Sequence, residues 1–281
     1  MSPRVILITG TSSGVGRSLV EAALAKGEIV VATLRKPEAL DDLKSKYTSE
    51  QLLVLPLDVT DLGQVKAAFA TAKETFGRLD VVVNNAGTTL IGELETTTDE
   101  QARALFETNF FGPMAITREA VALFRKQGSG GHIIQNTSSS ATKALAASSI
   151  YSATKAGLEA LSDAVRDELD PAWGIKVTTV QLGATRTSIG EKGTFAARDP
   201  AYEAVPSLPQ NNMIAAFLSG QFRMADPDKA ARAILDTLDL PAEERPQRVI
   251  LGADTLGFVE ERARILKDLV EHDREVAVSI M

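Results

Sequence analysis

Short apolar runs alternate with segments of helical periodicity along the chain. The apolar runs are RVILIT (4–9), EIVVATL (28–34), LLVLPL (52–57), LDVVVN (79–84), GHIIQNT (131–137), IKVTTVQL (175–182) and QRVILG (247–252). The helix-like segments cover residues 14–26, 37–47, 61–76, 99–126, 149–172 and 256–273. Runs that are apolar throughout, rather than at every second position, predict strands buried on both faces. The pattern therefore predicts about seven parallel strands.

The alternation of strands and helices predicts right-handed crossovers and a parallel sheet. A (β/α)₈ barrel is the competing architecture for a chain of 281 residues. The glycine pattern described below favours an open, doubly wound α/β sheet with helices on both faces. No linker, repeat or low-complexity run divides the chain, so we expect one domain over residues 1–281. Residues 185–225 break the alternation with several glycines and prolines, and we expect them to form a flap over the substrate.

The composition excludes several kinds of site. The chain has no cysteine, which rules out disulfides, thiol nucleophiles and thiolate metal sites. Its histidines are His132 and His272, from which a metal site or a Ser-His-Asp triad is hard to build, and we expect no metal. The net charge is −7 and no Lys/Arg run occurs, so we expect no nucleic-acid partner. No apolar run reaches about 18 residues, and we expect a cytoplasmic protein without membrane contact.

The stretch TGTSSGVG follows the first predicted strand and opens a helix. Gly10, Gly14 and Gly16 permit a tight turn in which backbone N–H groups approach a pyrophosphate, and the helix N-terminus adds partial positive charge. The spacing is GxxxGxG rather than the more widespread GxGxxG. A plain strand-to-helix turn is the alternative interpretation. We expect the motif to bind a dinucleotide cofactor, together with its remaining members Thr11, Ser12, Ser13 and Val15.

The ends of the next two predicted strands carry further candidate cofactor contacts. An acidic residue after the second strand would bind the ribose hydroxyls of NAD, whereas a basic residue would meet the 2′-phosphate of NADP. The chain has Leu34 there, followed by Arg35 and Lys36, which favours NADP over NAD unless these bases only cap a surface loop. After the third strand, we expect Asp58 to hydrogen-bond the adenine amino group and Val59 to pack on the ring.

Two more motifs are weak when each is taken alone. NNAG (84–87) ends the fourth predicted strand, where it either lines the cofactor or forms a simple turn. In YSATK, Tyr151 and Lys155 are four residues apart, which on a helix stacks a phenol beside an ammonium. Such a pair, without other signals, is more often a solvated helix face.

The motifs TGTSSGVG, NNAG, NTSSS and YSATK, in this order, resemble the short-chain dehydrogenase/reductase family in its single-domain form. The resemblance covers Val5 to about Thr187 and, more loosely, the last strand and helix. It implies a Rossmann-type doubly wound sheet with the strand order 3-2-1-4-5-6-7. It also implies an NAD or NADP cofactor and reversible hydride transfer between the nicotinamide and a carbonyl or alcohol.

The resemblance implies roles for individual residues. Tyr151 is similar to the family's catalytic acid/base, Lys155 to its partner, Ser138 to the serine that orients the carbonyl, and Asn109 to the fourth catalytic residue. Cofactor contacts are implied at Asn85, Ala86, Gly87, Gly183, Thr185 and Thr187. In LGATRT (182–187), Leu182 replaces the usual proline, which loosens the turn near the nicotinamide. Asn109 either holds a water in a proton relay to Lys155 or shapes a helix kink.

These assignments give each residue a chemical task. A free tyrosine titrates near pH 10, too high for a base at neutral pH. We expect the Lys155 ammonium to lower the pKa of Tyr151, and Ser138 to hold the substrate oxygen at the phenol.

The sequence therefore predicts an NADP(H)-dependent oxidoreductase. The apolar side chains that are dense in 185–225 either form the wall of an apolar pocket or, in NNMIAAFLSGQF, belong to an amphipathic helix that simply packs on the body. From the pocket interpretation we expect a moderately hydrophobic ketone, aldehyde or secondary alcohol as substrate. A non-catalytic, dinucleotide-binding redox sensor or regulator of the same fold is the alternative. We expect a homodimer or homotetramer, since helices 99–126 and 149–172 carry apolar residues on two sides in places and the resemblance implies an interface there.

Overall fold

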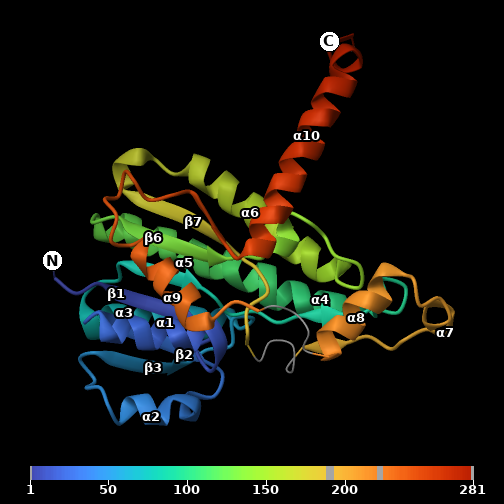
Figure 1. The fold of residues 1–281 in the computed structure, drawn as a ribbon. Coiled ribbons are helices and arrows are strands. Elements are labelled where there is room, and N and C mark those ends of the chain that lie inside the picture. The colour runs from blue at the N-terminus through green and yellow to red at the C-terminus, as the bar shows by residue number, and fades with distance from the viewer. Residues whose placement is uncertain (1, 188–192, 220–223, 280–281) are drawn as a thin grey trace.

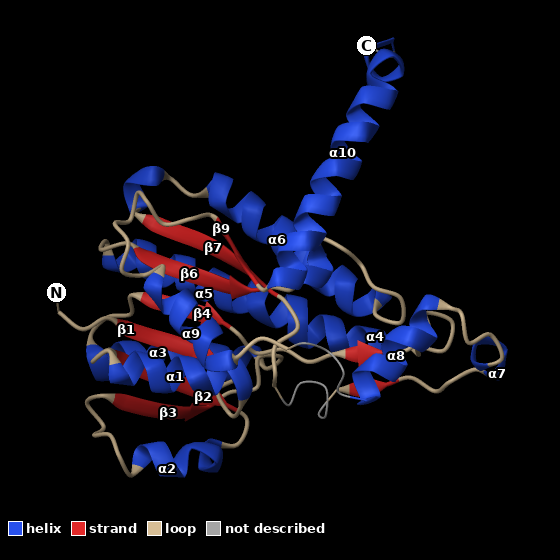
Figure 2. Cartoon of the chain, viewed as in Figure 1, coloured by secondary structure: helices blue, strands red, loops and turns tan. Residues whose placement is uncertain are grey.

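The computed structural model describes residues 2–187, 193–219 and 224–279. Its main sheet has seven parallel strands in the spatial order β3-β2-β1-β4-β6-β7-β9 (Figure 2). The strands are β1 (Val5–Thr9), β2 (Ile29–Leu34), β3 (Leu52–Pro56), β4 (Val81–Asn84), β6 (Gly131–Asn136), β7 (Ile175–Leu182) and β9 (Arg248–Leu251). Counted along the chain within this sheet, they confirm the predicted order 3-2-1-4-5-6-7. The barrel alternative is wrong, because the sheet is open at β3 and β9.

Helices cover both faces of the sheet, because successive residues of each strand point to opposite sides (Figure 1). One face packs against α1 (Gly14–Ala25) and α9 (Pro227–Asp236). The other packs against α3 (Leu62–Phe76), α5 (Gly112–Gln127) and α6 (Ser149–Glu168). In β1, Ile6 and Ile8 belong to the first core cluster, and Val5 and Leu7 belong to the second. The five central strands are thus largely buried on both faces, as predicted, whereas the edge strands β3 and β9 are mostly half-buried.

The helix predicted over 99–126 is built from three consecutive pieces. These are α4 (Asp99–Phe106), the π-helical turn η2 (Glu107–Phe111) and α5. Thr98 caps α4 in a reciprocal capping box with Gln101, at 3.0 and 3.2 Å. The π turn is a local widening that such helices often show at functional sites. It turns Asn109 into the protein, where its side chain is fully buried.

Residues 185–225, predicted to form a flap, contain β8 (Thr194–Phe195), α7 (Pro200–Glu203) and α8 (Pro209–Ser219). Positions 188–192 and 220–223 of this segment lie outside the described residues. β8 pairs in parallel with β5 (Leu90–Ile91), which follows β4. Tyr202 Oη donates to Glu95 at 2.8 Å, and Arg198 Nε lies 3.3 Å from a buried Glu93 carboxylate oxygen. These contacts fasten the flap to the loop that follows β4.

Shorter elements complete the description. They are η1 (Pro37–Leu40), α2 (Asp41–Lys44), η3 (Ser139–Ala141) and η4 (Pro171–Trp173). The last helix, α10 (Ala253–Ser279), extends beyond the predicted 256–273 and projects away from the sheet (Figure 1). Among the described residues, no helix combines the length and apolar character that a membrane crossing requires.

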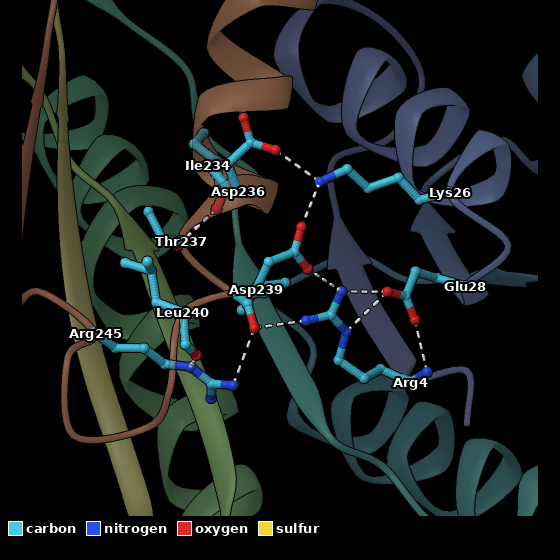
Figure 3. A network of polar contacts seen from close by, with 10 residues as sticks. Arg4, Lys26, Glu28, Ile234, Asp236, Thr237, Asp239, Leu240 and Arg245 are labelled. Atoms are coloured by element: carbon cyan, nitrogen blue, oxygen red, sulfur yellow. Dashed lines mark hydrogen bonds and ion pairs between the residues drawn. The ribbon is translucent and has the colours of Figure 1, made fainter. Parts of the chain in front are cut away.

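An ion-pair network closes the end of the sheet opposite to the strands' carboxyl ends (Figure 3). Arg4, just before β1, pairs with Glu28, just before β2, and with Asp239, which follows α9, at 2.8 Å. Lys26 pairs with Asp236 and Asp239 at 2.7 and 2.8 Å. Arg245 donates to the carbonyl oxygens of Leu238 and Leu240, and Arg4 also donates to that of Leu238. The network joins α1, β1, β2 and α9. The candidate catalytic residues lie at the opposite edge of the sheet, where the strands have their carboxyl ends.

His132 is a buried titratable group of this fold, far from that edge. Its Nε2 lies 2.9 Å from Thr178 Oγ1, which itself donates to Pro246 O, so Nε2 carries the proton. Nδ1 is buried and has no hydrogen-bond partner within the described part of the chain. Burial, with smaller effects from Arg245, Lys176 and Arg4, lowers the pKa of His132 to about 3.

We predict that His132 makes the fold sensitive to acid. Between pH 6.5 and 3 the unfolded histidine binds a proton and the folded one does not, so stability falls as the pH falls. His132 alone should cost about 2 kcal/mol of unfolding free energy between about pH 7.5 and pH 5. Urea unfolding should show this loss in the wild type and in His272→Gln, whose ring is exposed, but not in His132→Gln. Equal pH dependence of the wild type and His132→Gln would contradict the assignment.

Candidate active site

The glycine-rich turn brings the start of α1 close to the carboxyl end of β1. Gly10 and Gly14 have φ angles of +69° and +58°, which residues with a Cβ rarely adopt. A Cβ on Gly16 would lie 2.3 Å from the Gly10 carbonyl oxygen and 2.4 Å from Asn85 Nδ2. α1 has no side-chain cap at its N-terminus. Its first backbone N–H groups can therefore bind an anion that is placed before the helix.

A hollow lies beside this turn, and its lining includes Gly14, Arg17, Arg186 and Thr187. Thr187 closes over the turn, since a Cβ on Gly14 would lie 2.9 Å from Thr187 Cβ. Arg17 also binds Glu21 and Asp42, at 2.8 and 2.5 Å, which fixes its guanidinium beside the hollow. The glycine turn and the helix N-terminus together fit a dinucleotide pyrophosphate.

The side chains within the glycine motif have different positions. Thr11 is fully buried, and its hydroxyl donates to Thr33 O at 3.1 Å. Val15 is buried in the core, whereas Ser12 is exposed and Ser13, the N-cap residue of α1, is half-buried. Thr11 and Val15 thus hold the turn in shape, and Ser12 is the exposed side chain of the motif.

The NNAG motif ties three neighbouring strands together. Thr9 Oγ1 accepts hydrogen bonds from the backbone N–H groups of Asn85 and Ala86, at 3.0 and 2.9 Å. The Asn85 amide donates to Thr9 O at 2.8 Å, and its Oδ1 accepts from Asn136 Nδ2 at 2.9 Å. The side chain of Asn85 fixes the positions of β1, β4 and β6, and its expected contact with the cofactor stays a prediction. Gly87 lies deeper, facing Asn109 and Lys155.

The candidate adenosine contacts lie after β2 and β3. Arg35 and Lys36 are exposed, and neither forms an ion pair with any described residue. Asp58 Oδ1 accepts from the backbone N–H and the hydroxyl of Thr60, at 3.0 and 2.8 Å. Val59 is buried against Gly112, where a Cβ would lie 2.9 Å from it. Asp58 and Val59 thus have structural partners, while the two bases are available to a ligand.

The stretch after β7 is shaped by the start of α10. A Cβ on Gly183 would lie 2.1 Å from Asp254 Oδ1, so only glycine fits there. Asp254 Oδ2 accepts from Ala184 N at 2.8 Å. The Thr185 hydroxyl donates to Gly183 O at 3.0 Å, and Thr185 forms a β-bridge with Ala225. Asp254 thus supports a turn that was expected to be loose because Leu182 stands in the place of a proline.

The structure brings the four predicted catalytic residues together at the carboxyl edge of the sheet. Ser138 follows β6, and Tyr151 and Lys155 lie one turn apart on α6. Lys155 Nζ is 5.8 Å from the centre of the Tyr151 ring. A Cβ on Gly87 would lie 3.3 Å from Asn109 Oδ1 and 3.6 Å from Lys155 Nζ, which places Asn109 beside the ammonium. The pair on α6 is therefore not a solvated helix face.

Asn109 fastens the π turn η2 to Thr88, which lies in the loop between β4 and β5. Its Oδ1 accepts from Thr88 N at 3.0 Å, and its Nδ2 donates to Thr88 O at 2.9 Å. Nδ2 also lies 3.3 Å from Thr154 Oγ1, which donates to Tyr151 O at 2.7 Å. These contacts favour the helix-shaping role. The proton relay remains a prediction.

Burial dominates the electrostatics of the tyrosine and the lysine. It raises the pKa of Tyr151, and a hydrogen bond with Ser138 lowers this pKa in part. The Tyr151 pKa is thus raised rather than lowered as expected, because burial is the largest effect. The Lys155 ammonium donates to Asn136 O at 3.0 Å. Burial lowers the pKa of Lys155 to about 8, against an opposing effect of Glu159. Near neutral pH the phenol is protonated and the amine is charged.

Glu159 is a neighbour of this site that the sequence analysis missed. It is buried one turn beyond Lys155, and it accepts from Thr137 Oγ1 at 2.7 Å and from Gln181 Nε2 at 2.8 Å. Arg248 Nη1 lies 3.5 Å from its other oxygen. Thr137 stands between Asn136, which binds Lys155, and Ser138. The spacing of four residues from Lys155 was a signal available in the sequence.

The comparisons with known proteins agree with this arrangement. Residues 4–195 match the family model described as short chain dehydrogenase. An uncharacterized oxidoreductase of Schizosaccharomyces pombe, C162.03, is 35% identical over 278 residues, which are 98% of this chain and 91% of that protein. The structure of a short-chain dehydrogenase from Streptomyces avermitilis has a TM-score of 0.88 and 38% identity, covering 100% of this chain and 99% of its own. A short chain dehydrogenase from Burkholderia cenocepacia, in complex with NADP, has a TM-score of 0.73 and 26% identity, covering 96% and 97%.

The chain therefore belongs to the short-chain dehydrogenase/reductase family, and it is an oxidoreductase of a family that binds nicotinamide dinucleotides.

We predict that Glu159→Gln lowers the pKa of Lys155 below about 8, because the substitution removes the negative charge that supports the buried ammonium. The amide keeps nearly the same size. NMR titration of the ¹³Cε-labelled lysines, with Lys155→Met to assign the signal, measures this value. Asp163→Asn is the matched control, since Asp163 is on the same helix and also pairs with Arg248, at 2.9 Å, but is half exposed. An unchanged Lys155 titration in Glu159→Gln would contradict the prediction.

Proposed function

We propose that this protein is an NADP(H)-dependent oxidoreductase that transfers a hydride between the nicotinamide and a moderately hydrophobic ketone, aldehyde or secondary alcohol. The observation that carries the proposal is the convergence of Ser138, Tyr151 and Lys155 beside an anion-binding glycine turn. A protein that only binds dinucleotide has no need of this convergence.

A bound nicotinamide would supply or accept the hydride. Side chains of the protein would bind the substrate oxygen and transfer its proton. Ser138 donates a hydrogen bond to the substrate oxygen and holds it at the phenol. Tyr151 donates its proton to that oxygen during reduction, for which a raised pKa keeps the phenol ready near neutral pH. Lys155 places a positive charge beneath the developing phenolate and stabilises it. Asn109 holds the turn against which Lys155 rests.

The preference for NADP rests on the residues after β2. Proteins of this fold hold NADP or NAD, so the fold does not choose between them. Arg35 and Lys36 are exposed at the position where a cofactor's 2′-phosphate would lie, and an acidic residue is missing there. A guanidinium binds a phosphate through charge-assisted hydrogen bonds, which are among the strongest available.

The substrate class rests on the apolar residues of the flap and on the small cluster that they form with the body of the protein. Ile91, Ala147, Met213 and Ile214 form a small cluster that joins the loop after β4, the start of α6 and the flap. Ala147 adopts a φ of +57°, and its carbonyl oxygen accepts from Gly92 N at 2.9 Å. A residue with a Cβ keeps such a strained φ only where neighbouring contacts, such as this hydrogen bond, fix the backbone. Apolar side chains on the flap support a hydrophobic carbonyl or alcohol as substrate.

Three further expectations remain predictions. They are the single domain, the cytoplasmic location, and a homodimer or homotetramer assembled through α4, α5 and α6. Phe111, at the end of the π turn, is 42% exposed and packs edge-on against Phe110, which is consistent with a covered face there.

We predict that the purified protein oxidises NADPH in the presence of ketones or aldehydes from a hydrophobic panel, and that Tyr151→Phe lowers kcat by at least about 100-fold. The substitution removes the proton donor and little else. Dinucleotide binding, measured by calorimetry, should persist in Tyr151→Phe. Binding of NADPH without any turnover, and no effect of Tyr151→Phe, would favour a redox sensor instead.

We predict that Arg35→Ala raises the KM for NADPH at least about tenfold more than the KM for NADH, since a lost charged hydrogen bond costs about 1.5–3 kcal/mol. Lys46→Ala is a matched control, because Lys46 is an exposed base on the same side of the molecule. Steady-state kinetics with both cofactors measure the ratio. If this ratio does not change, Arg35 does not meet the 2′-phosphate.

A further inference from the structure

Helix α10 leaves the body of the protein after its first two turns (Figure 1). Asp254 and the buried Thr255 fix its start, and Lys143 binds Glu261 and covers the Phe258 ring. From Arg262 to Ser279 every residue is exposed. The exposed part spans about 26 Å, at 1.5 Å per residue.

This exposed part carries a stripe that is apolar except at two charged positions. Positions spaced alternately by three and four residues lie on one side of the helix. They are Val259, Arg262, Leu266, Leu269, Asp273 and Val276. Leu266, Leu269 and Val276 are 44%, 52% and 67% exposed, and Ile265 and Val270 flank them. A helix with such a stripe gains its stability by burying it against another surface.

The opposite side of the helix is charged. It carries Glu260, Arg264, Lys267, Asp268, Glu271, Arg274 and Glu275. The division into an apolar and a charged side indicates one partner surface rather than burial all around. Acidic side chains outnumber basic ones along α10, which disfavours an anionic membrane surface as that partner.

The two charges within the stripe identify the partner. In an antiparallel pair centred between Lys267 and Asp268, Arg262 of one helix lies opposite Asp273 of the other, and the reverse holds as well. The same alignment sets Leu266 opposite Leu269 and Val259 opposite Val276, so every facing pair is either oppositely charged or apolar. In a parallel, in-register pair, Arg262 would face Arg262 and Asp273 would face Asp273, which is repulsive.

We propose that α10 is a dimerisation helix that pairs antiparallel with α10 of a second copy of this chain, with the register set by Arg262 and Asp273. This interface is separate from the pairing expected through α4, α5 and α6. The inference does not depend on the proposed reaction, because it involves no residue of the active site.

Charge reversal tests the pairing. The full-length wild type, Arg262→Asp, Asp273→Arg and the double variant are compared by light scattering after size-exclusion chromatography. Each single variant places like charges opposite each other and should halve the mass of the assembly. The double variant restores opposite charges and should regain the wild-type mass. Arg264→Asp, on the charged side, is the matched control and should leave the mass unchanged, and circular dichroism checks that each variant is folded.

Disulfide trapping tests the direction, and the absence of native cysteine makes it clean. Under mild oxidation, an equimolar mixture of Val259→Cys and Val276→Cys should form a cross-linked dimer, whereas each variant alone should not. A parallel pair would give the opposite result. A monomeric wild type, single reversals with unchanged mass, or a double variant that stays dissociated would each overturn the proposal.

Discussion

The active site depends on a charged amine that is kept inside the protein. Lys155 is buried, and an isolated ammonium in such a place is costly unless it is paired and hydrogen-bonded. The carbonyl oxygen of Asn136 and the nearby carboxylate of Glu159 offset this cost. Both require α6 to pack closely on the ends of β6 and β7. The long apolar face of α6 and the buried strands beneath it therefore serve to hold one positive charge in position.

The same contacts join the cofactor end of the site to its chemical end. Asn136 gives its carbonyl oxygen to Lys155 and its amide to Asn85, and Asn85 in turn holds Thr9 and the glycine turn. A displacement of the glycine turn would thus be transmitted to Lys155 through Asn85 and Asn136. This linkage explains why Asn85 is built into the strand framework, and why the space beside Gly16 admits no side chain.

The main strands and helices were predictable because each is indicated by the pattern of apolar residues within its own segment. A strand buried on both faces is apolar at most positions, and the alternation with helices sets the topology. The pair β5–β8 was not predictable, because its two-residue strands acquire a partner only when the flap returns to the loop after β4. The π turn at Asn109 was hidden for a similar reason, since the inward direction of that side chain follows from its contacts with Thr88.

The candidate site shows the same division. The motifs named Ser138, Tyr151 and Lys155, which the structure brings together, and their catalytic roles stay predictions. Glu159 was missed because its contacts depend on β6, β7 and β9 meeting one face of α6. The direction of the Tyr151 pKa was also wrong from sequence, because spacing on a helix reports proximity and not burial.

A raised phenol pKa has a directional consequence. A protonated tyrosine already has the form that carbonyl reduction requires, whereas alcohol oxidation requires the phenolate. The protein alone provides only the Lys155 charge, and that charge declines above about pH 8 as the amine loses its proton. Oxidation therefore needs additional positive charge near the phenol, and an oxidised nicotinamide is the group that brings it. Under the proposed reaction, the protonated phenol of Tyr151 is the proton donor in reduction, and a bound oxidised nicotinamide would favour the phenolate that oxidation requires.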